Sequence, residues 1–449
     1  MTDTRRQDRS PVHEPTETTQ RWRVLPAPSD ASAAGAARYD LRTALAVDAG
    51  RAAARVSRGL GLGSGGMIGG RVALALRPDL LGRLGATKQV VTVTGTNGKT
   101  TTTEMIAEAL RSRGAAVSNA TGANMLDGHV AALMSDRRAP YASLEVDELH
   151  LARVTEQFAP AVIVLLNLSR DQLDRVGEIR SVERSLRAAL GQVPAAHVVA
   201  NRDDPNIVSA AFDHPGVTWV SGGSGWKHDA LTCPRCGTFL GESDRRWVCE
   251  CGLFRPEADW EVTDTGLRGP DGRERGLALR LPGHINRLNA AFALAAAWQL
   301  GCEADAALER IGGIEQANGR YAHVALGGWP VRLLLAENPA SWLEMLGLVG
   351  THRRRLVLAV NSRQADGYDV SWLWDIDFAS LRGRSVAVCG DRALDLAVRL
   401  RYAGVDCTVA SSVEEVLRRD AEQDADADPP DVVANYTAFR DLFARSVRT

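Results

Sequence analysis

The sequence predicts an α/β protein with two units, each built on a mostly parallel sheet, and with a small cysteine-rich insertion in the first unit. Two observations predict this fold class. Short β-rich runs alternate with helical patterns along most of the chain, which is typical of parallel sheets with crossover helices. Four cysteines are also concentrated in one short stretch. The 449 residues, of which 45% are hydrophobic, are enough for two or three domains.

The first unit follows a polar tail that we expect to be disordered. An alanine-rich helix is predicted at 38–60, and a helix at 289–300 closes the unit. A second unit begins near Arg320, and an acidic stretch at 420–428 predicts a solvated loop. The predicted strands lie at 90–94, 142–146, 161–166, 197–200, 331–335, 355–360 and 386–389. The predicted domains are a tail at 1–37, a first domain at 38–319 with its insertion at 228–255, and a second domain at 320–449.

Composition excludes several classes of protein. The net charge of −2 argues against a general nucleic-acid binder, which usually carries a basic excess. The chain has no run of about 18 apolar residues that would predict a transmembrane segment. Its N-terminus lacks the apolar core of a signal peptide. We therefore expect a cytoplasmic protein, whose seven cysteines suggest bound metal or free thiols before disulfides.

A strand, a glycine-rich turn, Lys-Thr and a helix follow one another at 90–113, which is typical of a phosphate-binding loop. Glycines let backbone N–H groups approach phosphate oxygens, and the helix N-terminus adds a favourable dipole. We expect Lys99 to reach the β- and γ-phosphates of ATP and the Thr100 hydroxyl to bind Mg²⁺. A glycine-rich turn without a ligand is the alternative. The predicted nucleotide-binding residues are Gly95, Thr96, Asn97, Gly98, Lys99, Thr100 and Thr101.

The segment from Thr94 to Thr102 resembles the ATP-binding signature of the Mur ligases and folylpolyglutamate synthases. Five further segments match these enzymes in order: Glu145 at a strand end, Asn167 to Arg175, Asn201 to Pro205, Gly283 to Ala290, and Gly319-Arg320. The resemblance implies that ATP phosphorylates a carboxylate and that an amine then attacks the acyl phosphate. It also implies that Glu145 binds Mg²⁺ and acts with Lys99 in catalysis, that Asn289 lies beside the adenine, and that Arg320 meets the phosphates.

Four cysteines, at 233, 236, 249 and 251, form two short knuckles in the predicted insertion. Glycines directly after both knuckles allow tight turns, and four thiolates predict one tetrahedral Zn²⁺ with no open coordination position. We therefore expect Cys233, Cys236, Cys249 and Cys251 to hold a structural zinc ion. A nucleic-acid-binding ribbon and four unrelated cysteines are the alternatives.

Three departures from the Mur ligase pattern narrow the choice of subfamily. Gln172 stands where most Mur ligases have a histidine, and no lysine lies between Lys99 and Lys227 to supply the carbamoylated lysine that many of them carry. The ligands of a second Mg²⁺ are therefore in doubt. Only about 50 residues separate the tail from the first strand, which is too few for a domain that holds a UDP-linked precursor.

The C-terminal half is similar to the MurT family, the synthetase subunits of lipid II isoglutaminyl synthase. Asn338-Pro339-Ala340 resembles the family's Asn-Pro-Ala-Gly, with Ser341 in place of the glycine and Glu337 where a lysine is common. The segment from Asp366 to Asp375 resembles its Asp-Gly-x-Asp-x-Ser-Trp-x-Trp-Asp motif.

The resemblance implies ATP-dependent amidation of the D-isoglutamate α-carboxylate of lipid II, at the cytoplasmic face of the membrane. Ammonia would come from a separate GatD-type glutaminase subunit in a heterodimer. A C-terminal aspartate would complete the partner's Cys-His pair, with Asp366 as the first choice and Asp369 as the second. In the alternative interpretation the aspartates cap turns and Trp372 and Trp374 pack in the core.

Two other functions stay open from sequence alone. One is a Mur or folylpolyglutamate-type ligase that adds an amino acid. The other is a nucleotide-gated module that uses the zinc ribbon to hold a partner.

Overall fold

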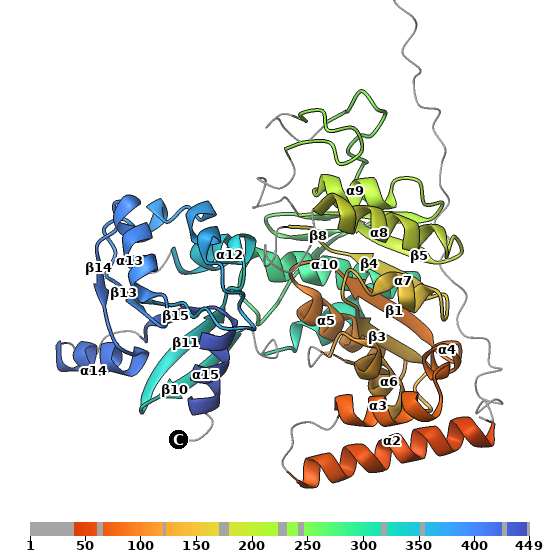
Figure 1. Ribbon diagram of the computed structural model, residues 1–449. Coiled ribbons are helices and arrows are strands. Elements are labelled where there is room, and N and C mark those ends of the chain that lie inside the picture. The colour runs from red at the N-terminus through yellow and green to blue at the C-terminus, as the bar shows by residue number, and fades with distance from the viewer. Residues whose placement is uncertain are drawn as a thin grey trace, which may run out of the picture.

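A computed structural model describes residues 40–60, 66–119, 123–169, 179–222, 231–240, 247–315, 321–350, 355–423 and 429–446. These residues form two separate sheets, each covered by helices, that lie side by side in Figure 1. The tail predicted at 1–37 lies outside the described residues. In the described part of the chain, no helix is both long enough and apolar enough to span a bilayer.

The first sheet has nine strands in the order β2-β3-β1-β4-β5-β6-β7-β8-β9. Neighbours from β2 to β7 are parallel, and β8 and β9 add an antiparallel edge. The strands are β1 (Gln89–Thr94), β2 (Ala116–Ser118), β3 (Tyr141–Glu145), β4 (Val162–Leu165), β5 (His197–Asn201), β6 (Val217–Ser221), β7 (Trp260–Val262), β8 (Gly266–Arg268) and β9 (Glu274–Gly276). The strand order reverses around β1, which is where ligands bind in sheets of this kind.

Helices cover both faces of this sheet, so its central strands are apolar on both sides. Residues of β1 alternate between two cores, with Val90 in one and Val91 and Val93 in the other. The first core is closed by α4 (Leu80–Gly85), α6 (Leu126–Ser135), α7 (Leu151–Thr155), α8 (Ile179–Gly191) and α9 (Pro205–Ala211). The second is closed by α5 (Lys99–Arg111), α10 (His284–Gln299) and α11 (Ala304–Gly312). An outer pair, α2 (Leu41–Gly59) and α3 (Gly66–Leu76), packs on α6.

The second sheet has six strands in the order β10-β11-β15-β12-β13-β14, all parallel except β10. They are β10 (Tyr321–Leu326), β11 (Trp329–Leu335), β12 (Leu356–Ala359), β13 (Val386–Cys389), β14 (Cys407–Val409) and β15 (Asp431–Ala434). One face packs against α12 (Pro339–Gly350), α13 (Ala393–Tyr402) and the short turns η2 (Ser371–Asp375) and η3 (Ala379–Leu381). The other packs against α14 (Val413–Gln423) and α15 (Tyr436–Ser446).

The predicted α/β fold class is confirmed, and each predicted strand coincides with an observed one to within a residue or two. One prediction was wrong in part. Residues 420–423 are the end of α14 rather than a loop, and Asp420 pairs with Arg355. Residues 424–428 lie outside the described part of the chain.

His197 at the start of β5 makes stability depend on pH. Its Nε2 lies 2.8 Å from the Thr218 hydroxyl, and burial lowers the pKa of His197 to about 4. The unfolded chain binds this proton below about pH 6.5, whereas the folded chain does not until pH 4. Stability is therefore intact above pH 6.5 and falls as the pH drops towards 4, by roughly 2 kcal/mol after allowance for partial exposure. Urea unfolding of wild type and His197→Asn at pH 7 and pH 5 measures this, and an equal pH dependence in both would contradict it.

Candidate active site

Three strand ends meet at one edge of the first sheet. Val93 of β1 pairs in register with Glu145 of β3, and Thr94 pairs with Leu165 of β4. Because these strands are parallel, the loops that follow them leave the sheet on the same side. The phosphate-binding loop, Glu145 and the segment that begins at Asn167 are therefore brought together.

Glycine is required at two positions of the loop. Gly95 and Gly98 have φ angles of 137° and 86°, and Gly98 caps the N-terminus of α5. A Cβ at Gly95 would lie 2.9 Å from the Asn167 nitrogen, and one at Gly98 would lie 2.7 Å from Asn289 Oδ1. The loop thus packs closely against the segment after β4 and against α10, and a side chain larger than glycine would clash at either position.

The segment after β4 holds the loop in place. The backbone N–H of Asn97 donates to Asn167 Oδ1 at 2.8 Å, and Asn167 Nδ2 donates back to the Asn97 carbonyl at 3.0 Å. The backbone N–H of Ser169 donates to the Thr96 hydroxyl at 3.0 Å. These bonds fix the loop backbone without occupying the N-terminus of α5. Residues 170–178, with Gln172, lie outside the described part.

Glu145 is held beside the first turn of α5. The Thr100 hydroxyl donates to Glu145 Oε2 at 2.8 Å, and the glutamate is buried. Its backbone is fixed by two residues that sequence analysis missed. The Glu145 N–H donates to Asn119 Oδ1 at 2.7 Å, and His129 Nε2 lies 2.8 Å from the Glu145 carbonyl. Burial lowers the pKa of His129 to about 4, so the neutral imidazole donates this bond. Neither residue lies in a motif that could have indicated it.

Lys99 points back over the loop. Its Nζ donates to the Thr96 carbonyl at 3.3 Å and pairs with Glu148 Oε1 at 3.2 Å. Sequence analysis did not single out Glu148, although it stands only three residues after Glu145. The pair offsets the charge of a largely buried ammonium and leaves the amine beside the loop backbone. A phosphate at the loop would compete with Glu148 for that amine.

Glu145 and Thr100 fit a magnesium site chemically, since Mg²⁺ prefers a carboxylate and other oxygen ligands. Lys99 and the N-terminus of α5 offer the positive potential that bound phosphates require. Arg320, which was predicted to meet the phosphates, lies outside the described residues.

The second domain contacts the phosphate loop through a pair of amides. Asn338 Nδ2 donates to Asn97 Oδ1 at 2.9 Å, and Asn97 Nδ2 lies 3.3 Å from Asn338 Oδ1. The position of Asn338 is fixed in turn, because its Oδ1 accepts the backbone N–H of Ser341 at the start of α12 at 3.0 Å. Side chains from residues 241 positions apart therefore join the two domains directly at the loop.

Removal of this amide pair should lower turnover. We expect Asn338→Ala to reduce the ATP-dependent rate about tenfold, because two hydrogen bonds of roughly 0.5–1.5 kcal/mol each position one domain against the other. Ser341→Ala is the matched control, since the Ser341 hydroxyl contacts the backbone N–H groups of Glu337 and Asn338 at the same helix end. Steady-state ADP release measures both. Equal losses in the two variants would assign the effect to helix capping instead.

The two tryptophans of the C-terminal motif differ in exposure. Trp372 is buried against Trp342, with ring centroids 6.3 Å apart. Trp374 is exposed and makes an edge contact with Tyr402. The interpretation that both tryptophans pack in the core is therefore right for the first and wrong for the second.

Both aspartates of the motif bind backbone N–H groups. Asp366 Oδ1 accepts from Thr437 at the start of α15 at 2.8 Å, and Oδ2 accepts from Arg363 at 3.1 Å. Asp369 Oδ1 accepts from Ser371 at 2.8 Å, and its side chain is exposed. Asp366 thus ties the motif to α15, while Asp369 accepts the N–H of the first residue of η2 at the surface.

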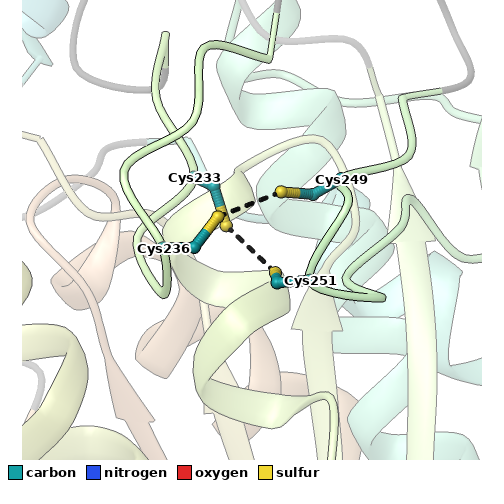
Figure 2. Close-up of side chains that lie close together, drawn as sticks. All are labelled: Cys233, Cys236, Cys249 and Cys251. Carbon is teal, nitrogen blue, oxygen red and sulfur yellow. Dashed lines mark hydrogen bonds between the residues drawn. The ribbon is translucent and has the colours of Figure 1, made fainter.

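The four cysteines of the insertion converge (Figure 2). Their sulfurs all lie within 4.8 Å of one another, with Cys233 Sγ 3.6 Å from Cys251 Sγ and Cys236 Sγ 3.3 Å from Cys249 Sγ. These distances are too long for disulfides, and the thiols are free. Sulfurs around a tetrahedral Zn²⁺ lie about 3.8 Å apart, given Zn–S bonds of about 2.3 Å. The cluster therefore fits one metal ion.

The backbone around the cluster has the form of two knuckles. The Cys233 sulfur accepts backbone N–H groups of Arg235 and Cys236. Gly237 and Gly252 follow the knuckles with φ angles of 83° and 89°, so each turn needs the left-handed conformation that glycine allows.

The cysteine insertion is fixed to α9 of the first domain. Arg235 donates to the Ser209 carbonyl at 2.8 Å and pairs with Asp213 at 2.7 Å. Cys233, Cys249 and Leu253 share a small apolar core with Val208 of α9. No residue of the cluster takes part in the described contacts of the phosphate loop.

The fold and the site define an ATP-dependent ligase of the Mur type. Residues 93–297 match the Mur ligase middle domain, and residues 335–439 match the MurT ligase C-terminal domain. The chain is 30% identical over 442 residues to the MurT subunit of a lipid II isoglutaminyl synthase (glutamine-hydrolyzing) of Streptococcus pneumoniae, covering 90% of this chain and 98% of that one. The chain belongs to the MurT family.

A second relative agrees with this assignment, and a solved structure shares the fold. A MurT subunit of Staphylococcus aureus is 26% identical over 397 residues, covering 82% of this chain and 90% of the relative. The fold is similar to that of a pseudomurein peptide ligase type C from Methanothermus fervidus, with a TM-score of 0.63 at 19% identity, over 83% of this chain and 80% of that one.

Proposed function

We propose that the chain is the synthetase subunit that amidates the α-carboxylate of D-isoglutamate in the stem peptide of lipid II, giving D-isoglutamine. The observation that carries the proposal is the contact between a complete phosphate-binding loop and a MurT-type C-terminal domain, made through Asn97 and Asn338. The relatives named as lipid II isoglutaminyl synthase subunits support the choice of substrate.

The reaction has two steps in this proposal. A carboxylate oxygen of the substrate attacks the γ-phosphorus of ATP, the bond to the bridging oxygen breaks, and ADP leaves. Ammonia then attacks the carbonyl carbon of the acyl phosphate, loses a proton and expels phosphate. Mg²⁺ held by Glu145 and Thr100 would offset charge on the phosphate oxygens.

Residues of this chain position the reactants. Lys99 moves from Glu148 to the β- and γ-phosphates, and its charge stabilises the negative charge that develops during transfer. Asn289 borders the loop at Gly98, on the side proposed for the adenine, and Arg320 would contact the phosphates. Thr96, Gly95 and Thr101 complete the nucleotide site.

The proposed nitrogen source is ammonia from a GatD-type glutaminase in a heterodimer. The MurT relatives are named as glutamine-hydrolyzing subunits, which supports glutamine as the donor. The cysteine cluster is proposed to hold a structural Zn²⁺, since its four sulfurs leave no coordination position for a substrate. We place the reaction at the cytoplasmic face of the membrane.

The nitrogen donor that the chain uses in the absence of a partner subunit tests the proposed chemistry. With lipid II, ATP and Mg²⁺ present, ammonium chloride should stimulate phosphate release and give amidated lipid II without any partner. Stimulation by an amino acid and not by ammonium would favour an amino-acid-adding ligase instead.

Asp366 and Asp369 are the proposed links to the partner's glutaminase site. We expect Asp366→Asn to lower glutamine-dependent amidation about a hundredfold or more, as loss of an orienting carboxylate does in a catalytic triad. Asp369→Asn is the parallel variant and should have the smaller effect. Amidation driven by ammonium chloride should stay near wild type in both, and circular dichroism controls for the contact of Asp366 with α15. Full glutamine-dependent turnover in both variants would rule out this link.

A further inference from the structure

The outermost helix of the first domain, α2, exposes most of its large aliphatic side chains instead of burying them. Against α3 and α6, helix α2 buries one valine, Val47, and otherwise small or polar residues, namely Thr43, Ala46, Gly50 and Ser57. Its leucines and its second valine face outward instead: Leu45 is 59% exposed and Val56 is 61% exposed. A surface helix normally buries its large apolar stripe. In Figure 1, α2 lies at the rim of the molecule, with no described element on its outer side.

Tight packing holds this arrangement in place. A Cβ at Gly50 would lie 2.7 Å from the Gly69 carbonyl oxygen, and one at Gly69 would lie 2.8 Å from the Gly50 carbonyl oxygen. Such close approach of two helix backbones leaves no room for α2 to rotate its leucines inward. Arg51 also donates to the Met134 carbonyl of α6 at 3.0 Å. The outward aliphatic face is therefore built into the domain.

Helix α3 also exposes large aliphatic residues. The exposed large aliphatic residues of the two helices and their ends are Leu41, Leu45, Val56, Leu60, Met67, Ile68 and Leu76. We call this set the aliphatic face. Because α2 and α3 pack against each other, these side chains are concentrated on one part of the domain, and exposed apolar surface concentrated in this way is typical of a site of interaction with a protein or a membrane.

Positive charge predominates in the segment that carries the aliphatic face. The described residues from 40 to 77 contain six arginines and two aspartates, a net charge of +4 in a chain whose total is −2. Arg42, Arg55 and Arg58 are exposed and form no ion pair with a described residue. Aliphatic side chains flanked by arginines on a surface helix are typical of segments that lie in the interface of an anionic bilayer.

We infer that the aliphatic face docks on an anionic membrane surface, with α2 lying in the plane of the lipid headgroups. The aliphatic side chains would enter the acyl boundary while Arg42, Arg55 and Arg58 pair with lipid phosphates. This inference goes beyond the proposed reaction and does not rest on it. Docking at this surface would bring a lipid-linked substrate to the side of the domain that leads to the candidate site. Helix α6 packs against α3, and its His129 contacts the backbone of Glu145.

Vesicle binding by the full-length chain tests the inference. Co-sedimentation with phosphatidylglycerol–phosphatidylcholine vesicles should exceed co-sedimentation with pure phosphatidylcholine and should weaken with salt. Leu45→Gln with Val56→Gln should reduce the partition coefficient at least tenfold. Arg55→Gln with Arg58→Gln should reduce it about fivefold for each arginine removed. All four side chains are exposed, so these variants should keep the wild-type unfolding midpoint.

The matched control removes exposed aliphatic residues elsewhere. Leu394→Gln with Val398→Gln, on α13 of the second domain, should leave vesicle binding unchanged. The inference is overturned if the full-length chain does not bind anionic vesicles, or if the α13 variant loses binding while the α2 variants keep it. It is also overturned if the α2 variants keep vesicle binding and lose only self-association or binding to the glutaminase. Vesicle binding that appears only after residues 1–39 are deleted would overturn it as well. Ammonium-driven amidation in detergent should be unchanged in every variant, so the proposed reaction is tested apart from the docking.

Discussion

Lys99→Ala should abolish ATP-dependent turnover while leaving the fold intact. We expect a loss of roughly 10³-fold or more in kcat, because a single preorganised charge at a transferring phosphoryl group contributes on this scale. Lys99 lies beside the loop backbone, where its amine pairs with Glu148 and donates to the Thr96 carbonyl. ADP release and amidated product, followed in the same reaction, measure the effect.

Two further variants serve as controls, one at a lysine away from the site and one at the partner of Lys99. Lys88→Ala removes a lysine whose amine bonds the carbonyls of Asp136 and Ala139 away from the site, so its rate should stay within about twofold of wild type. Glu148→Gln removes the partner of Lys99 and should alter the apparent affinity for ATP more than kcat. If Lys99→Ala retained amidation, nucleotide hydrolysis would not drive the reaction, and a nucleotide-gated binding module would be favoured.

Cys233→Ser should release the metal and destabilise the cysteine insertion. Cys233 is fully buried between the two knuckles and α9, so the change removes a thiolate ligand and leaves a buried hydroxyl in an apolar core. We expect a loss of about 3 kcal/mol or more in local stability. Bound zinc measured by elemental analysis should fall from one ion per chain to none, and hydrogen exchange should rise in α9.

A cysteine outside the cluster provides the comparison. Cys407→Ser, at a half-buried thiol of β14, should keep the zinc and the exchange pattern of α9. Chelation of the wild-type protein should reproduce the effect of Cys233→Ser. If the variant kept its zinc, the cluster would not be the site, and if α9 were unaffected, the insertion would not depend on the metal.

Much of the fold was predictable because its central strands are buried and separated by helices. The β1 strand is apolar on both faces and runs directly into the glycine-rich loop, so both its type and its end were evident. The three-residue strands β2, β7, β8, β9 and β14 were missed because so short a segment carries no periodicity. The longer strands β6, β10 and β15 were missed as well. Helix α2 was predicted as a helix, but its orientation depends on the contact between Gly50 and Gly69, which no local pattern encodes.

The candidate site was predictable only where its residues belong to short motifs. The phosphate loop, Glu145 and the four cysteines all did so. Asn119, His129 and Glu148 did not, because they act through contacts made by distant parts of the chain. The pairing of Asn97 with Asn338 lies between these cases, since both motifs were recognised but their contact appears only when the two domains are placed together.

The most direct test of the proposed amidation traces the nitrogen atom from the glutamine side chain to the lipid product. The purified chain and its candidate glutaminase would be mixed with lipid II, ATP, Mg²⁺ and glutamine labelled with ¹⁵N at the side-chain amide, and the lipid product analysed by mass spectrometry. We expect the label in the α-carboxamide of the stem peptide, with one ADP released for each amide formed, and no label in product made with Lys99→Ala. Unlabelled lipid II in the presence of both active subunits, or an added amino acid in place of the amide, would contradict the account.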